Sequence, residues 1–245
     1  VLGAAQVQAL YLGDRLGWYR VLAEEGPLTA AELAHRTGTV ERYAREWLER
    51  FAEEADVVAI GPGLGRSESL NALVLWALRT ISVPLLLDAD ALNALEGVEP
   101  TAWRDRAAPW IATPYPGELA RWAGRATSAI QSDREATAME WARSSSNGSL
   151  ILVLKGAGTI VTDGLRLFVN PSGNPGMATG GSGDVLTGVI AAMVGQRLPV
   201  FEAAVLGVYA HGLAGDVARD QHGEVGMIAG DLVDALPDTF AQLAR

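Results

Sequence analysis

A glycine-rich loop followed directly by an apolar helical segment is the feature of this sequence that most clearly indicates chemistry. The loop and the residue after it read Thr179, Gly180, Gly181, Ser182, Gly183 and Asp184. Glycine leaves the backbone amides open to close approach, and a helix start carries about half a positive charge. We therefore expect the loop to bind an anion such as phosphate, with the Asp184 carboxylate beside it. The alternative is an ordinary loop whose acidic residue only stabilises the helix dipole.

The elements around this loop alternate between short apolar strands and helices from Asp56 onward. Strands are expected at 57–60, 84–87, 110–113 and 150–154, and a hairpin pairs 159–162 with 166–169 by turning at Asp163 and Gly164. Helices are expected over 67–80, from Ser132 with a capping box to Glu135, and near residues 182, 200 and 229. The pattern indicates an α/β fold with a mostly parallel sheet covered by helices on both faces.

Five motifs each follow a predicted strand. They read GPGLG at 61–65, DADALN at 88–93, TPYPGE at 113–118, KGAGT at 155–159 and TGGSGD at 179–184. Ligands of open α/β sheets gather at the carboxyl ends of the strands, so we expect all five motifs to face one crevice.

In order and spacing these motifs resemble those of the ribokinase-like NAD(P)H-hydrate dehydratases, over residues 56–245. The resemblance implies a ribokinase-like fold and the repair of a hydrated nicotinamide cofactor. In that reaction ADP or ATP phosphorylates the ring hydroxyl, and loss of the phosphate restores NADH or NADPH. Magnesium would bridge the phosphates, although the sequence offers no evident protein ligand for it. The implied partner is the small molecule NAD(P)H hydrate.

The resemblance also implies roles for individual residues. Asp184 would act as the base or orienter for the attacking hydroxyl and contact the substrate. Gly63, Gly65 and Tyr115 would contact the hydrate, although the family usually has histidine where this chain has Tyr115. The nucleotide would be bound by Lys155, Gly156, Ala157, Gly158, Thr159, Asn174, Thr179, Gly180, Gly181, Ser182 and Gly183.

Several polar residues near these motifs have a structural alternative. Asp88 and Asp90 either approach the crevice or cap the next helix, and Asn93 either follows the family pattern or makes a structural hydrogen bond. Lys155 is alternatively a solvated strand end. His211 is expected to pack or hydrogen-bond within a long helix rather than act in catalysis, and His222 to lie in the loop after it.

Residues 1–52 lack the alternation of strands and helices and are predicted to form a separate all-helical module ahead of a domain at 53–245. Helices are expected over 9–22 and 40–51, with a capping box at Thr29 and Glu32. The pattern resembles the N-terminal winged-helix-like module of certain S-adenosylmethionine-dependent methyltransferases. DNA binding is disfavoured because residues 1–50 hold six arginines against seven acidic residues.

In the dehydratase family the domain begins with strands and a helix ahead of the GPGLG loop, so the sheet here is expected to be truncated at its N-terminal side. An uncovered sheet would expose apolar faces and an unpaired edge. We therefore expect the N-terminal helices to cover the sheet or to mediate homo-oligomerisation.

Composition narrows the functional classes further. The net charge of −10 and the pI near 4.8 argue against nucleic-acid and anionic-membrane partners. The chain has no cysteine, which excludes thiolate chemistry and is compatible with the cytoplasm. We expect no membrane span, because no apolar run approaches the roughly 18 residues that one needs. Two alternative functions stay open, a small-molecule kinase of the same superfamily and a catalytically silent nucleotide-binding protein.

Overall fold

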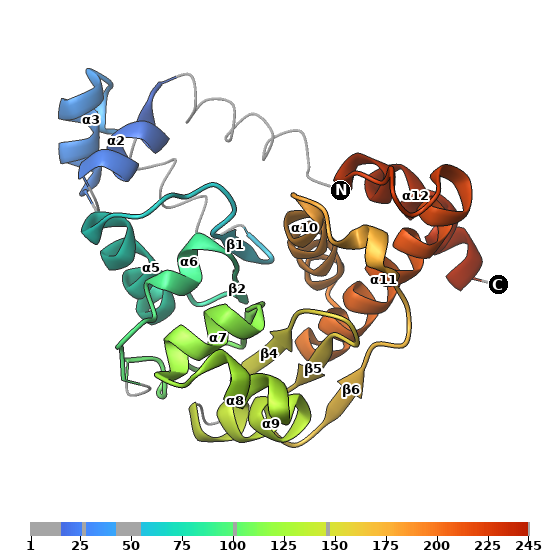
Figure 1. Cartoon of the computed structure of the whole chain (residues 1–245). Helices are drawn as coiled ribbons and strands as arrows, with labels where there is room; N and C mark the ends of the chain where they lie inside the picture. The colour runs from blue at the N-terminus through green and yellow to red at the C-terminus, as the bar shows by residue number, and fades with distance from the viewer. Residues whose placement is uncertain (1–15, 26–27, 43–54, 100–101, 146–147, 245) are drawn as a thin grey trace.

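The apolar segments form one six-stranded sheet in a computed structural model that describes residues 16–25, 28–42, 55–99, 102–145 and 148–244 (Figure 1). The strands lie in the order of the chain. They are β1 (Val58–Ile60), β2 (Leu85–Leu87), β3 (Trp110–Ala112), β4 (Leu150–Leu154), β5 (Ile160–Thr162) and β6 (Leu167–Val169). Strands β1 to β4 pair in parallel, and β5 and β6 form the predicted antiparallel hairpin. The mostly parallel sheet is therefore confirmed.

Alternation along the strands builds a separate core on each face of the sheet. In β2, Leu85 and Leu87 belong to one cluster of buried residues, and Leu86 belongs to the other. The same alternation continues in β4, where Leu152 and Ile151 face opposite sides. Because β2, β3 and β4 are buried on both faces, these strands read as continuous apolar runs.

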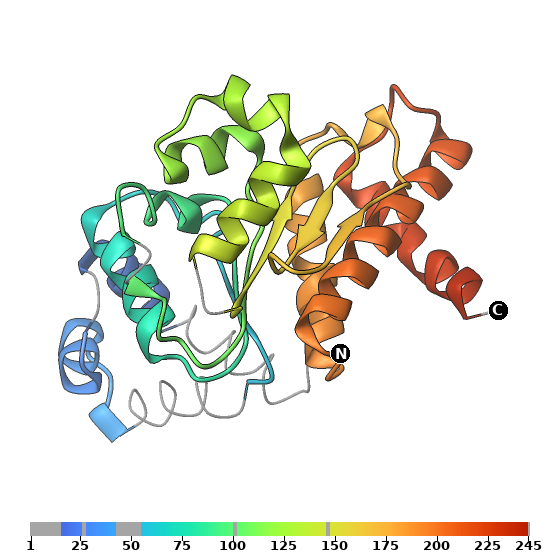
Figure 2. The same ribbon diagram turned by 90° about the horizontal axis from the view of Figure 1, so that it is seen from below.

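Helices cover the two faces unequally (Figures 1 and 2). The first core is closed by α5 (Glu68–Thr80), α6 (Asp90–Asn93), α7 (Pro116–Ala123), α8 (Thr127–Ser132) and α9 (Arg134–Ser145). The second is closed by α10 (Ser182–Gly195) and α11 (Val200–His222), with Phe240 of α12 (Ala229–Leu243) packed against it. A short 3-10 helix, η2 (Pro175–Met177), precedes α10.

Two helix starts were predicted with different success. Ser67 caps α5 as expected, by accepting a hydrogen bond from the Leu70 amide. The capping box at Ser132 is wrong, because Ser132 ends α8 and its hydroxyl donates to the Ala129 carbonyl. Asp133 instead caps α9, through its carboxylate and the Ala136 amide.

Four tryptophans hold the helices of the first core together. The Trp103 ring lies edge-on to Trp110 and Trp122, with centroids 5.8 and 5.7 Å apart. Trp141 of α9 meets Trp122 of α7 edge-on at 5.3 Å. Such contacts add about 0.5–1.5 kcal/mol per pair beyond the burial of apolar area.

Two described helices precede the sheet, α2 (Trp18–Glu25) and α3 (Ala30–Thr37). The capping box of Thr29 and Glu32 is confirmed at the start of α3. Figure 1 shows this pair beside α5, and α2 contacts that helix. Residues 9–15 and 43–51 of the predicted helices lie outside the described residues, as does the predicted boundary at 52 and 53, so these stay predictions.

Within the described part of the chain, α11 is the one helix whose length and composition would allow it to cross a bilayer. Half of its apolar window is buried inside the protein. Ala203 and Val208 pack in the second core, and Ala214 and Ala218 pack in a further cluster with Leu232 and Ala235 of α12. The packing is that of a core helix.

Candidate active site

Three polar side chains meet where β2, β3 and β4 end. Asp88 follows β2, Thr113 follows β3 and Lys155 follows β4, and all three are buried. Asp88 Oδ1 accepts hydrogen bonds from Thr113 Oγ1 and Lys155 Nζ, and each donor–acceptor distance is 2.6 Å. Thr187 of α10 donates to the second oxygen of the same carboxylate over 2.8 Å. Asp88 therefore faces the crevice end of the sheet rather than only capping a helix.

The Lys155 ammonium lies beside the start of α10. Its Nζ is 4.2 Å from the centre of the Tyr115 ring, in a cation–π contact. A Cβ added to Gly183 would lie 3.4 Å from Nζ and 3.7 Å from the Tyr115 hydroxyl. Lys155, Tyr115 and Gly183, which are far apart in the chain, thus line one small space. The solvated strand end considered for Lys155 is wrong, since the residue is 4% exposed.

The start of α10 has the features expected of an anion site. The N-cap residue Gly181 has a positive φ of 88° and no side chain to bond the first amides. The amides of Gly183 and Asp184 lie in the first turn, where an α-helix provides no carbonyl partners. A Cβ on Gly180 would meet nothing within 4 Å, and the Asp184 side chain is exposed. The turn is therefore open to a ligand at Gly180 and Asp184.

His211 of α11 supports this turn from behind. Its Nε2 donates to the carbonyl of Ser182, the first residue of α10, over 2.9 Å. Burial lowers the pKa of His211 to about 4, and the nearby charge of Lys155 lowers it further, while the hydrogen bond to Ser182 opposes the shift. The ring is neutral at pH 7 and acts as a structural donor, as its place in the helix had indicated.

Arg134, a residue that sequence reasoning missed, holds the loop after β4. Its guanidinium donates to the carbonyls of Leu154, Lys155 and Ala157. A Cβ on Gly156 would lie 3.1 Å from this guanidinium. The loop is closed further by Thr159 Oγ1, which donates to the Gly156 carbonyl over 2.9 Å. The predicted nucleotide loop 155–159 is thus held in one shape from α9.

Asn174 lies against α11 rather than against Lys155. Its side-chain amide donates to Asp216 over 3.1 Å, and its side-chain oxygen accepts from the Gly176 amide and caps η2. The same Asp216 accepts a hydrogen bond from the Gly173 amide. The close approach depends on Gly212 and Gly215 of α11, where a Cβ would overlap Ser172 and Met177. The loop ahead of the anion turn is therefore anchored on α11.

The glycine loop after β1 meets the DADALN segment. The Gly65 amide donates to Asp90 Oδ2 over 2.9 Å, and Arg66 donates to Asn93 over 2.9 Å. A Cβ on Gly61 would overlap the Asp88 carbonyl oxygen, so only glycine fits there. Ala89 has a positive φ of 48° between the two aspartates, a strained conformation of the kind found at functional sites. Gly63 has open space around it.

No cluster of three or more histidine, cysteine, aspartate or glutamate side chains is present among the described residues. A protein cage for a metal is therefore absent from that part of the chain. Mg²⁺ is commonly bound by substrate phosphates, one or two carboxylates and water. The exposed carboxylate of Asp184 beside the anion turn fits that mode of binding.

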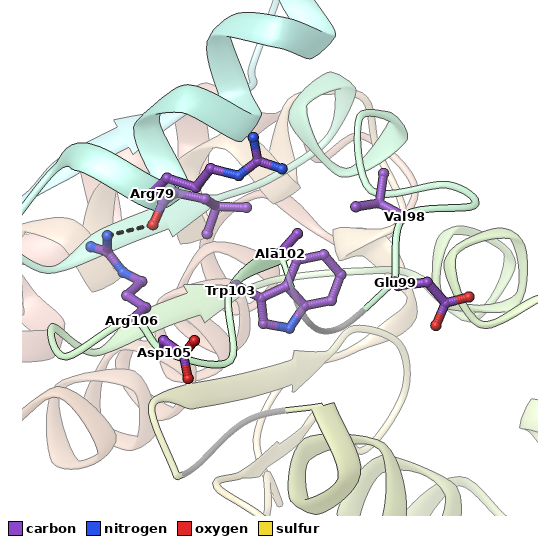
Figure 3. Close-up of a pocket in the computed structure, with 8 residues that line it drawn as sticks. Arg79, Val98, Glu99, Ala102, Trp103, Asp105 and Arg106 are labelled. Carbon is purple, nitrogen blue, oxygen red and sulfur yellow. Dashed lines mark hydrogen bonds between the residues drawn. The ribbon is translucent and has the colours of Figure 1, made fainter.

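A cavity of about 540 Å³ lies elsewhere in the described part of the chain. Figure 3 shows Trp103, Glu99 and Arg106 among its lining residues. Arg106 donates to the carbonyls of Leu78 and Val83, which precede β2. The cavity is thus near the amino ends of the strands, away from the carboxyl ends where Lys155 and α10 meet.

The sequence model of the family described as NAD(P)H-hydrate dehydratase matches residues 7–238. The chain belongs to this family. The match runs across the predicted boundary at residues 52 and 53.

Two curated proteins of the same family show how much of a longer protein the chain spans. The chain is 50% identical over 198 residues to the bifunctional NAD(P)H-hydrate repair enzyme Nnr of Moorella thermoacetica, which covers 80% of this chain and 36% of that protein. It is 38% identical to the ADP-dependent (S)-NAD(P)H-hydrate dehydratase of Neisseria meningitidis, with 73% and 60% covered. The chain therefore spans just over a third of the length of the first of these relatives.

Two solved structures are similar to this chain in fold. The ADP/ATP-dependent NAD(P)H-hydrate dehydratase of Bacillus subtilis, co-crystallised with ATP and Mg²⁺, is 33% identical with a TM-score of 0.69, covering 79% of this chain and 69% of that one. A ribokinase-like superfamily protein of Enterococcus faecalis is 28% identical with a TM-score of 0.67, covering 86% and 72%. The ribokinase-like fold expected from the motifs is confirmed.

Proposed function

We propose that this chain catalyses the nucleotide-dependent dehydration of (S)-NAD(P)H hydrate to NAD(P)H. The observation that carries the proposal is that Lys155, from the end of β4, lies beside Gly183 in the open first turn of α10. Asp184, the next residue, is exposed at the same turn. A phosphoryl group and an attacking hydroxyl could therefore be bound side by side.

ADP or ATP, with Mg²⁺, would supply the phosphoryl group that turns the ring hydroxyl into a better leaving group. Asp184 would accept the proton of that hydroxyl, because its carboxylate is exposed beside the anion turn. The hydroxyl oxygen would attack the terminal phosphorus as the bond to the rest of the nucleotide breaks, which releases AMP from ADP or ADP from ATP. The amides of Gly180 to Gly183 and the Lys155 ammonium would stabilise the charge on the transferred group. Departure of the phosphate, together with loss of a proton from the neighbouring ring carbon, then restores the nicotinamide ring.

The other predicted contacts divide between the two ligands. Support for a nucleotide role of 155–159 comes from Arg134, which holds that loop next to the anion turn. Tyr115 is 46% exposed although its ring also contacts Lys155. It could therefore contact the hydrate by stacking or through its hydroxyl, in place of the usual histidine. Gly63 and Gly65 would let the dinucleotide approach the backbone of the loop after β1.

A repair assay tests the proposal. The purified chain is incubated with NADPH hydrate, Mg²⁺ and either ADP or ATP, and recovery of NADPH absorbance is recorded. We expect Asp184→Asn to lower kcat by about 10²- to 10⁴-fold, the usual contribution of a positioned base. Glu202→Gln is the matched control, because Glu202 is an exposed acidic residue in the first turn of α11, and it should retain activity.

Two other outcomes would favour the alternative functions. A stable phosphorylated product without recovery of NADPH would indicate a small-molecule kinase. Nucleotide binding without turnover, unchanged by Asp184→Asn, would indicate a silent nucleotide-binding protein.

We also propose that the chain acts in the cytoplasm and self-associates. Support for self-association comes from β6, which is at the edge of the sheet and exposes Leu167 and Val169. Light scattering over a range of concentrations tests this proposal, and a monodisperse monomer would contradict it.

A further inference from the structure

The buried carboxylate of Asp88 accepts hydrogen bonds from three separate elements of the fold. Thr113 and Lys155 donate to Oδ1, and Thr187 donates to Oδ2. Asp88 is 0% exposed, so no water competes for these oxygens. The three donors therefore fix both the position and the rotation of the carboxylate.

Of these three donors, Lys155 is the one whose polar atom lies at the anion turn. Its ammonium has three N–H groups, and among the described residues Asp88 is its one hydrogen-bond acceptor. A buried ammonium with unpaired N–H groups is costly. A phosphate oxygen at the start of α10 would accept them, because Nζ is already 3.4 Å from the position of a Cβ on Gly183.

We propose that Asp88 is a positioning residue for phosphate binding and that Thr113 and Thr187 hold it in place. Asp88 fixes the Lys155 ammonium against the start of α10, and does not itself touch the ligand. The inference rests on the proposed function, in which Lys155 and α10 bind the phosphates of ADP or ATP.

Thr187 has a second effect through the same bond. It is four residues after Gly183 on α10, so both residues lie on the same face of the helix. Its hydrogen bond to Asp88 joins this face to the end of β2. The Asp88 carboxylate therefore positions two groups that would bind the phosphate. One is α10, through Thr187, and the other is the Lys155 ammonium.

Calorimetric binding of ADP and of ATP with Mg²⁺ tests the role of Thr187. Thr187→Val keeps the shape and removes the donor, and we expect it to weaken nucleotide binding about tenfold, as for loss of a hydrogen bond to a charged group. Thr187→Ser restores the donor and should return the affinity to within about twofold of the wild type. Thr239→Val is the matched control, because Thr239 is also buried but donates to the Ala235 carbonyl within its own helix.

A double-mutant cycle tests whether Asp88 acts through Lys155. Asp88→Asn and Lys155→Met are each expected to weaken nucleotide binding, and the double variant to be no weaker than Lys155→Met alone. A residue that only stabilises the fold would give additive losses. Thermal unfolding by circular dichroism shows whether each variant is folded. If the variants at Asp88 do not fold, the affinities of Thr187→Val and Thr187→Ser decide whether the positioning role holds.

The possible outcomes separate the two proposals. Additive losses in the cycle, or equal affinities for Thr187→Val and Thr187→Ser, would overturn the positioning role while the wild type still binds nucleotide. A wild-type chain that binds neither ADP nor ATP would overturn the proposed function, and the positioning role with it.

Discussion

His211 Nε2 donates a 2.9 Å hydrogen bond to the carbonyl of Ser182 and so connects the middle of α11 to the first residue of α10. The imidazole is buried, and burial is the main reason why its pKa falls to about 4. The first turn of α10 is therefore held by a neutral side chain, and protonation of that side chain would destabilise the folded state.

This connection predicts how stability depends on pH. Between pH 6.5 and about 4 the unfolded chain carries a proton on His211 that the folded chain does not. The free energy of unfolding therefore falls as the pH falls through this window, by about 3 kcal/mol for this group. Urea unfolding of the wild type and of His211→Gln should show that the variant lacks this part of the pH dependence.

His222→Gln provides the control for that experiment, since His222 is exposed at the end of α11. It should keep the pH dependence of the wild type. Equal pH dependence in the wild type and in His211→Gln would contradict the assignment.

Gly61→Ala is predicted to destabilise the protein strongly. The added Cβ would overlap the carbonyl oxygen of Asp88, and the φ of 138° is unfavourable for any side chain. We expect a loss above about 3 kcal/mol in the free energy of unfolding. Gly63→Ala, at a φ of 68° with open space around it, should cost only about 1 kcal/mol. Similar losses in the two variants would mean that the contact with Asp88 is not the cause.

Trp103→Ala is predicted to lower the free energy of unfolding by about 3–5 kcal/mol, because it leaves a cavity among the buried rings. Trp103 is 1% exposed and touches both Trp110 and Trp122 edge-on. Trp76→Ala is the comparison, since Trp76 is 46% exposed on α5. Near-ultraviolet circular dichroism should change much more for the first variant, and an equal change in both would argue against the ring cluster.

Arg134→Met is predicted to loosen the loop after β4 and to weaken nucleotide binding about tenfold, by removing charged hydrogen bonds to its carbonyls. The long aliphatic stem is kept, so packing changes little. Arg125→Met removes only an exposed ion pair with Glu140 and should leave the affinity unchanged. Nucleotide titration measures both variants, and an unaltered affinity in Arg134→Met would show that the loop does not depend on this anchor.

The parallel sheet could be predicted from sequence because short, continuous apolar runs such as Leu85–Leu87 and Leu150–Leu154 are typical of strands buried on both faces. The meeting of the motifs followed from their places after strands, and Lys155 and Gly183 are indeed neighbours. Helix α7 was missed because its sequence after Pro116 reads as part of a turn. The cap at Ser132 was misassigned because Asp133, the adjacent residue, offers the same chemistry.

The hydrogen-bond partners of Asp88 could not be predicted from the sequence. The local signal was Thr187, a hydroxyl in the apolar part of α10 that follows Asp184, which indicates that a polar partner is buried nearby. The spacing of residues in the sequence does not identify that partner. Nor does it show that Arg134 contacts the loop after β4. Such contacts are set by tertiary packing. The roles of the candidate site residues stay predictions until binding and activity are measured.

Strands β1 to β4 lie side by side in the order in which the ribosome makes them, so each can join its neighbour as it emerges. The network around Asp88 cannot form in this way, because Thr187 is made 99 positions later. A nascent chain that ends before α10 exposes the apolar face that includes Leu86 and Ile151, and leaves its buried ion pair open to water. Such an incomplete chain is the species most in need of a chaperone.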